Sequence, residues 1–380
     1  MELKVLNADI GKSDYYTGTL PEGCQQCVLG KKLVLFITGM CSRQCFYCPV
    51  GDHKFGSDVI FANERPVQDI SDVFLEVNAC GATGAGITGG DPLCRVERCA
   101  AYIIALKQKY GSAFHIHLYT PLELVNAHTM HLLYTAGLDE LRLHFDLDTD
   151  QYWDHVHAAL AFDWTVGVEI PAIPTHEKET KKLIYFLAGK VSFLNLNELE
   201  VADTKLNVLL DRGYVTKDTY SYGVLGSSAF ALEMVRYASA KGLTAHHCTA
   251  ATKDGIQLME RVKNRGKIVA HSFDIQTPDA TFIRGVIYEE KPSFGYRAQL
   301  ALKHKDVEVR RLRTLRTHLC QTLRLNKADV AIDDVKYRLL TSRKIVVKYQ
   351  QEIRALCLIP AIVEEMPTYD LFEVEIEFLE

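Results

Sequence analysis

The chain has 380 residues, a formal net charge of −5, and 48% hydrophobic and 24% charged residues. This length suits one barrel-sized domain of about 200 to 250 residues with a smaller second domain, and the composition is that of an ordinary soluble protein. No apolar run approaches the ~18 residues of a membrane span, and the N-terminus has no signal sequence, so we expect a cytoplasmic protein without a membrane partner. Eleven cysteines in such a chain indicate metal or redox chemistry and exclude a secreted disulfide framework.

Residues 1–30 form a polar lead-in that ends in a C-x2-C pair, Cys24 and Cys27. Two thiols do not complete a metal site, so a further ligand must come from elsewhere. Cys248 is the best candidate, because it follows a late strand that a closing barrel would bring towards the first strand. These three cysteines could hold an auxiliary [4Fe-4S] cluster, or zinc with a histidine as the fourth ligand. The alternative is a reduced pair and an unrelated buried cysteine.

A buried strand at residues 32–38 leads into the main chemical motif of the chain. Cys41, Cys45 and Cys48 follow it in a C-x3-C-x2-C spacing, and such a short loop can fold three thiolates around one face of an iron-sulfur cluster. Three protein ligands leave one iron open for a substrate or cofactor. A zinc site is the weaker alternative, because zinc usually takes four ligands in two C-x2-C pairs. The loop follows a strand, which is where α/β barrels carry chemistry.

The next strand, near residue 85, ends in Gly89, Gly90, Asp91 and Pro92. Two glycines let the backbone approach a ligand closely, and a carboxylate beside them can accept hydrogen bonds from an ammonium group. By itself such a string is an ordinary turn. Its place one helix after the cysteine loop indicates a ligand site made by two neighbouring strand ends.

From residue 33 onward, strand-like and helix-like stretches alternate with short connections. This pattern predicts a parallel sheet with helices packed outside it, and right-handed crossovers would curl the sheet into a full or partial barrel. The expected helices cover residues 71–81, 95–110, 122–136 and 227–241, and the further strands cover 114–120, 140–145, 166–173, 193–201 and 243–248. The remaining cysteines fall in helical or apolar patterns and are expected to be small buried side chains: Cys80, Cys94, Cys99, Cys320 and Cys357.

Polar side chains at later strand ends predict a polar cavity inside the sheet. Glu169 lies on the 166–173 strand, and a buried carboxylate needs hydrogen bonds or a cationic partner. The alternative is structural pairing with Arg142 or His144. Further candidates are His115, His117 and Tyr119 on one strand and Asn195, Asn197, Glu198 and Glu200 on another.

The cysteine loop, with Tyr47 as the aromatic residue before Cys48, and the Gly-Gly-Asp-Pro string resemble the signature of the radical S-adenosylmethionine (SAM) superfamily. The resemblance implies an α/β chain with a partial (β/α)6 barrel. It also implies that one electron from the cluster cleaves SAM to methionine and a 5′-deoxyadenosyl radical, which takes a hydrogen atom from the substrate. The implied cofactor contacts are Cys41, Cys45 and Cys48 on the [4Fe-4S] cluster, Tyr47 near adenine, Gly89, Gly90 and Asp91 (in place of the usual Glu) on the SAM amino group, and Glu169 nearby.

A longer resemblance, over roughly residues 20 to 290, is to an archaeal branch of this superfamily described as related to the pyruvate formate-lyase activating enzyme. It implies a reductant such as ferredoxin or flavodoxin as the electron donor. It indicates the class of chemistry but neither the substrate nor a catalytic residue. We therefore expect three regions: a lead-in at 1–30, a barrel at 31–267, and an accessory α+β domain at 268–380.

The accessory domain resembles nothing familiar, and its charge is the main clue to its role. Residues 293–350 contain fourteen Lys and Arg but five Asp and Glu, a local net charge of +9. Arginine-rich modules bind phosphates, which predicts tRNA as a partner. The stretch after Val363 contains seven acidic residues and no basic ones. The alternative is therefore that this acidic tail pairs with the basic segment inside one folded domain.

Three functions remain open from the sequence. The leading one is a radical SAM enzyme that modifies tRNA. The alternative is a radical SAM activase or maturase that acts on a protein or a small molecule. The third possibility is a non-catalytic iron-sulfur protein that binds no SAM.

Overall fold

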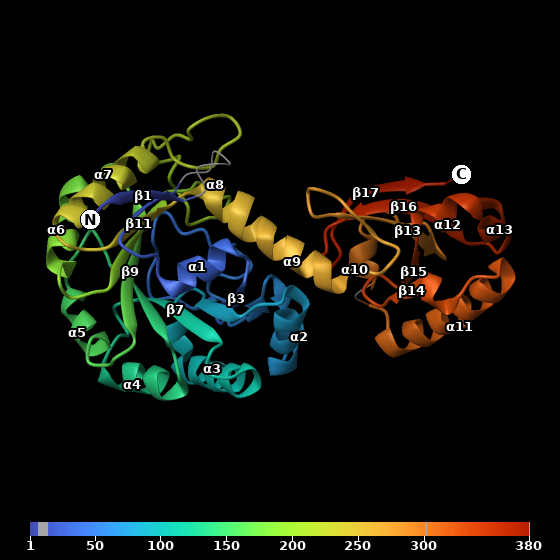
Figure 1. The fold of residues 1–380 in the computed structure, drawn as a ribbon, viewed down its shortest axis with the longest axis horizontal. Coiled ribbons are helices and arrows are strands. Elements are labelled where there is room, and N and C mark those ends of the chain that lie inside the picture. Colours follow the sequence, from blue (N-terminus) through green and yellow to red (C-terminus); the bar gives the residue numbers. More distant parts are fainter. Residues whose placement is uncertain (7–13, 301, 380) are drawn as a thin grey trace. The chain divides into compact units, whose positions relative to one another are not determined.

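The computed structural model describes residues 1–6, 14–300 and 302–379, so residues 7–13 of the expected lead-in lie outside it. The chain divides into two compact units, Met1–Arg261 and Val262–Glu380, and each is described by itself (Figure 1). The expected boundary at 267/268 falls inside helix α9 (Met259–Val269). Among the described residues, no helix is long and apolar enough to cross a membrane.

The first unit is built on one large sheet whose central part is parallel. The strand order ends at β1 on one side and at β5 on the other, so the sheet is a partial barrel. The predicted α/β partial barrel is confirmed, with seven parallel strands where about six were expected. These strands are β3 (Lys32–Phe36), β6 (Gly84–Thr88), β7 (His115–Pro121), β8 (Glu140–His144), β9 (Thr165–Ala172), β10 (Phe193–Glu198) and β11 (Ala245–Cys248). The antiparallel pair β1 (Leu3–Leu6) and β2 (Asp14–Thr17) flanks β11, and β4 (Phe61–Ala62) and β5 (Arg65–Pro66) flank β3.

Helices connect the successive parallel strands, as the alternation of the sequence predicts. Helix α2 (Ile70–Cys80) begins at a capping box made by Asp69 and ends at Gly81, which has a φ of 59° that favours glycine. The others are α3 (Val96–Tyr110), α4 (Ala127–Ala136), α5 (Val156–Ala159), α6 (Glu177–Leu187) and α7 (Ser227–Ala240), with short helices η2 (Pro92–Arg95), η3 (Trp153–His155), α8 (Ala250–Thr252) and the π-helical η4 (Lys253–Leu258).

Side chains alternate along the parallel strands between an apolar outer face and a polar inner face. On β7, Ile116 and Leu118 join the hydrophobic core, whereas His117 and Tyr119 line a cavity. The strand register continues this polar row, because Tyr119 pairs with Arg142 of the next strand. Outer apolar residues pack under the helices, while the inner polar residues cannot form a dry core. The barrel interior is therefore polar, as the strand-end residues predicted.

Helix α1 (Glu22–Val28) packs against the sheet strands β3, β6 and β7. Gly23 makes this close packing possible, because a Cβ there would lie 2.4 Å from Arg142 Nη2 and 2.7 Å from His117 Nδ1. At the other end of the helix, a Cβ on Gly30 would lie 2.3 Å from the backbone nitrogen of Arg261. The end of the lead-in is thus part of the first unit.

The second unit is an antiparallel sheet with helices, as expected for an α+β domain. The strand order is β14 (Val330–Asp333), β15 (Arg338–Thr341), β13 (Phe282–Tyr288), β16 (Ile359–Glu365) and β17 (Glu373–Phe378), with β12 (Ile275–Gln276) on β13. Its helices are α10 (Tyr296–Leu300), α11 (Lys305–Leu323), α12 (Arg343–Lys348) and α13 (Gln350–Ala355), with the short η5 (Lys327–Asp329). Two separate apolar clusters lie within this unit.

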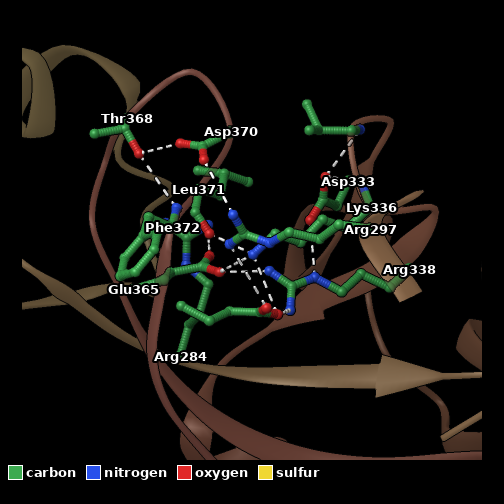
Figure 2. A network of polar contacts seen from close by, with 12 residues as sticks. Arg284, Arg297, Asp333, Lys336, Arg338, Glu365, Thr368, Asp370, Leu371 and Phe372 are labelled. Atoms are coloured by element: carbon green, nitrogen blue, oxygen red, sulfur yellow. Dashed lines mark hydrogen bonds and ion pairs between the residues drawn. The ribbon is translucent and has the colours of Figure 1, made fainter. Parts of the chain in front are cut away.

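A buried network of ion pairs joins the acidic tail to the rest of the second unit (Figure 2). The fully buried Arg338 binds Asp333 Oδ2 and Glu373 Oε1, each at 2.8 Å, and also Glu365. Lys336 Nζ lies 3.1 Å from Glu373 Oε1, and Arg284 Nη1 lies 3.1 Å from Glu365 Oε1. Part of the acidic tail therefore pairs with basic residues inside one folded unit.

Candidate functional site

The three cysteines of the loop after β3 line a cavity of about 360 Å³. Strand ends and the loops after them supply the rest of its wall, because the carboxyl ends of parallel strands meet at one edge of a sheet. Gly89 and Gly90 from the loop after β6 are among the lining residues. The two sequence motifs therefore meet at one cavity.

The two glycines are required by the packing of one loop on the other. A Cβ on Gly89 would lie 2.4 Å from the carbonyl oxygen of Thr38, and one on Gly90 would lie 2.5 Å from that of Met40. The backbone nitrogens of Gly90 and Asp91 donate to these same carbonyls of Thr38 and Met40, at 2.9 and 2.7 Å. Any side chain at either glycine would push the cysteine loop away from its position.

Asp91 differs from the expectation that its carboxylate faces the cofactor. It is fully buried and is absent from the residues that line the cavity. Its Oδ1 accepts hydrogen bonds from Leu93 N at 2.9 Å and from Thr120 Oγ1 at 2.7 Å. Burial raises the pKa of Asp91 to about 6. The side chain thus caps η2 and ties it to β7.

Tyr47 lines the cavity of about 360 Å³ and contacts His144. The phenol oxygen lies 3.0 Å from His144 Nε2, and His144 Nδ1 lies 2.9 Å from the carbonyl oxygen of Glu169. Burial lowers the pKa of His144 to about 4 and raises that of Tyr47 well above its usual value, so both are neutral. Because a carbonyl only accepts, Nδ1 carries the proton and Nε2 accepts from the phenol.

Two sets of contacts that the sequence did not predict hold the cysteine loop in place. Arg43 Nη2 lies 2.6 Å from Asp146 Oδ2. The segment after β10 binds the loop backbone, because Thr204 Oγ1 donates to Cys48 O at 2.9 Å and Val208 N donates to Phe46 O at 2.9 Å. The segment after β10 is more than 150 residues away in the chain, and its residues belong to no recognisable motif.

The donor set of this cavity fits a cluster better than a single ion. Among the described residues, no three His, Cys, Asp or Glu side chains are placed to hold one metal ion. Instead, three free cysteines stand along one wall of a roomy cavity. Three thiols on one short loop beside a cavity of about 360 Å³ suit a [4Fe-4S] group with space for a second ligand.

A second cavity, of about 310 Å³, is lined by Cys24, Cys27 and Cys248. The structure therefore brings together the three cysteines that the sequence grouped. Arg142 Nη2 and Asn195 Nδ2 each lie 3.4 Å from Cys24 Sγ. None of the other five cysteines lines either cavity. Buried side chains were expected for all five, but Cys357 is exposed and Cys94 is half-buried.

Glu169 lines both cavities and forms part of the wall between them. Its Oε2 accepts from Arg142 Nη1 and Asn195 Nδ2, and its Oε1 accepts from Asn197 Nδ2, all at 2.9 Å. Burial alone would raise the pKa of Glu169, but Arg142 and the two amides outweigh it and lower this pKa. Glu169 thus lines a polar cavity, as predicted, and also pairs with Arg142, as the alternative had it. Lys253, which the sequence did not single out, lines both cavities too.

Matches to solved structures are of low similarity. The radical SAM methyltransferase TsrM from Kitasatospora setae is 10% identical, with a TM-score of 0.36 over 52% of this chain and 42% of that chain, so the match spans under half of that protein. Methylornithine synthase (PylB) is 13% identical, with a TM-score of 0.37 over 61% and 79%. Coproporphyrinogen III oxidase (HemN) from Escherichia coli is 11% identical, with a TM-score of 0.34 over 90% and 94%. Our fold assignment rests on the strand order instead.

Sequence relatives are more informative. The profile described as the radical SAM superfamily matches residues 35–166, which include the cysteine loop and the two glycines. A protein of Methanocaldococcus jannaschii, provisionally named a glycyl-radical enzyme activating enzyme, is 38% identical over 300 residues, or 76% of this chain and 79% of that protein. At this identity and coverage the chain belongs to the radical SAM superfamily, and it is a radical SAM enzyme that uses a [4Fe-4S] cluster and SAM.

Proposed function

We propose that this radical SAM enzyme activates a glycyl-radical enzyme by taking one hydrogen atom from a glycine of that partner protein. The observation that carries the proposal is the 38% identical relative, whose provisional name states this activity. From the sequence alone, tRNA was the leading substrate and a protein or small molecule was the alternative. We now favour the protein alternative.

The larger cavity would carry the chemistry. Cys41, Cys45 and Cys48 would ligate the catalytic cluster, since all three line this cavity as free thiols. When bound, the cluster would supply the electron, and SAM would supply the 5′-deoxyadenosyl group that takes the hydrogen atom. Gly89 and Gly90 expose only backbone groups to the cavity, and these would hydrogen-bond the amino group of SAM. Asp91 would act on SAM only indirectly, by fixing this turn.

The groups around Tyr47 would give the cofactor a neutral and constant surface. Tyr47 and His144 are both uncharged, and their pKa values lie outside the range from pH 5 to 8. Glu169 is neutralised by Arg142 at 2.9 Å. We therefore expect Tyr47, His144 and Glu169 to add no pH dependence of their own to cofactor binding in this range, whereas Asp91, with a pKa of about 6, titrates within it.

Ion pairs inside the second unit weaken the argument for tRNA. Arg338, Lys336 and Arg297, which contributed to the basic character of the segment, are bound by the acidic tail (Figure 2). Their charge is not available for phosphates. Five of the fourteen basic residues form ion pairs among the described residues. The other nine form none there and remain as the argument for tRNA: Lys303, Arg310, Arg313, Arg316, Arg324, Lys327, Arg343, Lys344 and Lys348.

Formation of 5′-deoxyadenosine by the anaerobically reconstituted, reduced full-length protein tests the proposal. We expect a glycyl-radical enzyme from the same source to stimulate this formation and to acquire a glycyl radical signal in its EPR spectrum. Deuterium at the partner's glycine Cα should appear in 5′-deoxyadenosine. Stimulation by tRNA from a strain lacking this gene, without stimulation by the protein, would overturn the proposal in favour of tRNA modification.

Cys45→Ala is the first variant to measure. Because Cys45 would be one of three cluster ligands, we expect the variant to form no detectable 5′-deoxyadenosine, with or without the partner. Cys357→Ala is the matched control, since Cys357 is exposed and lies in the second unit. Activity retained by Cys45→Ala would reject the assignment of the catalytic cluster.

A further inference from the structure

The smaller cavity contains three cysteines that the proposed function does not use. Cys24 and Cys27 lie three residues apart on α1, so their side chains share one side of the helix. Cys248 comes from the end of β11, more than 200 residues later. All three side chains line one cavity of about 310 Å³. Cysteines from such distant parts of the chain come together here because the sheet and α1 are arranged in this specific way.

The charges around these thiols indicate an anionic occupant. Lys32, Arg142, Lys253 and Arg261 line the cavity, whereas Glu169 is the one carboxylate among its described lining residues. Glu140 and Glu169 bind Arg142, and Glu200 binds Lys253.

Two of these cations have no carboxylate partner in the part of the chain that the structure describes. Lys32 is only 3% exposed, and its Nζ contacts His115 Nδ1 at 2.6 Å instead. Arg261 is half-buried beside the same cavity. A buried cation without a counter-ion is costly, so thiolates of a metal centre would supply the missing negative charge.

Hydrogen-bond donors also point at the sulfur atoms. Arg142 and Asn195 donate to Cys24 Sγ, and Gln257 Nε2 lies 3.6 Å from Cys248 Sγ. Such N–H···S contacts stabilise the thiolate ligands of iron-sulfur clusters. Gln257 reaches the cavity from the π-helical η4, and π-helical turns are rare and frequent at functional sites.

Asn195 Oδ1, on the cavity wall, is buried and has no hydrogen-bond partner among the described residues, and its side chain is only 2% exposed. Buried polar atoms normally find a partner. This atom is therefore a second, independent indication that a further group or its bound water belongs in this cavity.

We propose that Cys24, Cys27 and Cys248 hold a second iron-sulfur cluster of the [4Fe-4S] type. A cluster fits better than zinc, because the cavity is far larger than one ion and no three potential ligands among the described side chains are placed for a single ion. This proposal does not depend on the identity of the substrate. Thr88, Tyr119, Glu169, Asn197 and Lys253 line both cavities, so one layer of side chains would separate the two clusters.

Iron, sulfide and zinc contents of anaerobically reconstituted full-length variants test the proposal, together with Mössbauer spectra. The wild-type protein and the Cys357→Ala control should contain about eight irons per chain. The combined change Cys41→Ala, Cys45→Ala and Cys48→Ala should leave about four irons in a [4Fe-4S] spectrum that SAM does not alter. The combined change Cys24→Ala, Cys27→Ala and Cys248→Ala should also leave about four irons, in a cluster that SAM does alter.

Unchanged iron in the second triple variant would overturn the proposal, as would complete loss of iron in the first. Stoichiometric zinc in the first variant would replace the cluster with a zinc site. If a triple variant fails to fold, the reduced wild-type protein still decides, because two reduced clusters should integrate to about two EPR spins per chain. About one spin per chain in fully reduced protein would show a single cluster and reject the second one.

The shared wall between the cavities gives a further readout. Two reduced clusters separated by one layer of side chains should couple magnetically, so the fully reduced wild-type EPR spectrum should differ from the sum of the spectra of the two triple variants. A spectrum equal to that sum would reject the placement of the second cluster in this cavity. Neither measurement uses the partner protein, so failure of the activase proposal would leave this inference standing.

Discussion

Gly90 sets how closely the turn after β6 can approach the cysteine loop. A Cβ at this position would lie 2.5 Å from Met40 O and 2.9 Å from Cys41 Cβ. The first of these contacts is with backbone, which cannot rotate away as the end of a flexible side chain can. The position of one proposed cluster ligand therefore depends on the absence of a side chain in the loop after the neighbouring strand, β6.

We expect Gly90→Ala to displace the cysteine loop. Overpacking of this kind costs about 1–3 kcal/mol, and a displaced cluster should lower 5′-deoxyadenosine formation by about tenfold or more, because reacting groups must be positioned closely. The measurement is the initial rate of 5′-deoxyadenosine formation, together with iron content. Gly51→Ala is the control, because a Cβ there would meet only the side chain of His53, at 3.1 Å. Equal rates in the two variants would contradict this account of Gly90.

Tyr47→Phe removes one hydrogen bond without changing the shape of the cavity wall. The phenol donates to His144 Nε2 at 3.0 Å, and a neutral hydrogen bond contributes about 1 kcal/mol. Because this bond positions the ring and does not itself contact SAM, we expect SAM to bind more weakly by at most about fivefold, the equivalent of the whole bond, as measured by titration of the EPR spectrum of the reduced cluster. Tyr134→Phe, on a side chain outside both cavity walls, should leave this affinity unchanged. An unaltered affinity in Tyr47→Phe would place the phenol outside the cofactor contacts.

At the residue scale, local spacing was a good guide and long-range pairing was not. The three cysteines of the loop lie close together in the sequence, as do the two glycines, so both motifs could be recognised from spacing alone. Asp91 was predicted to face the cofactor, and its actual partner is Thr120 on a different strand. Arg43 and Asp146 form an ion pair across more than 100 residues. No spacing rule connects such residues before the sheet register is known.

Among the elements, the strands of the second unit depend on their buried charges. Arg338 on β15 is fully buried and binds Asp333, Glu365 and Glu373. We expect Arg338→Met to leave these carboxylates uncompensated and to destabilise the second unit by about 3–5 kcal/mol. The loss is measured as the decrease in the free energy of unfolding in urea, with hydrogen exchange of the β13 and β16 amides as the probe of unfolding. Arg313→Met, at an exposed position of α11, should change the stability little.

The same network predicts a dependence of stability on pH. Burial alone would raise the pKa values of Asp333 and Glu373, but for Asp333 the charges of Arg338 and Lys336, and for Glu373 a hydrogen bond from Tyr296 and these same charges, outweigh burial and lower both. A carboxylate whose folded pKa is lowered contributes stability above its unfolded pKa of about 4 and loses it as the pH falls further. Hydrogen exchange in β15 and β17 should therefore accelerate below about pH 4. Constant protection from pH 6 to 3 would contradict these pKa shifts.

The order of the elements was largely predictable, while their number was not. The helical periodicity of the sequence located α2, α3, α4 and α7, and most of the predicted ends lie within one residue of the observed ends. The start of α4 is the exception, because it was expected at residue 122 and lies at Ala127. Helix α6 was not predicted, although Thr180, Leu183, Ile184 and Leu187 follow the spacing of an amphipathic helix and are buried. Its charged first turns concealed this pattern. The strand count was given as about six, although the predicted stretches already included residues 243–248, which form β11, the seventh parallel strand.

For the molecule as a whole, three arginines of α11 without ion pairs among the described residues give a direct test between a protein and an RNA partner. Arg310, Arg313 and Arg316 stand at a three-residue spacing on α11, towards one side of the helix. If the partner is a protein glycyl-radical enzyme, we expect their combined change to Gln to leave partner-stimulated 5′-deoxyadenosine formation within about twofold. A loss of stimulation accompanied by salt-dependent binding of tRNA to the wild-type protein would instead restore nucleic acid as the substrate.

The pairing of β2 with β11 has a consequence for how the protein is made. Tyr15 and Tyr16 pair with His247 and His246, so the first part of the unit to leave the ribosome finds its partner only after about 230 more residues have been synthesised. Contacts this distant in sequence form late and slowly. Until then Cys24 and Cys27 lack the wall that carries Cys248. Any metal delivered to this cavity must therefore enter after translation of the first unit is complete, and the two thiols of α1 remain open to oxidation while the chain emerges.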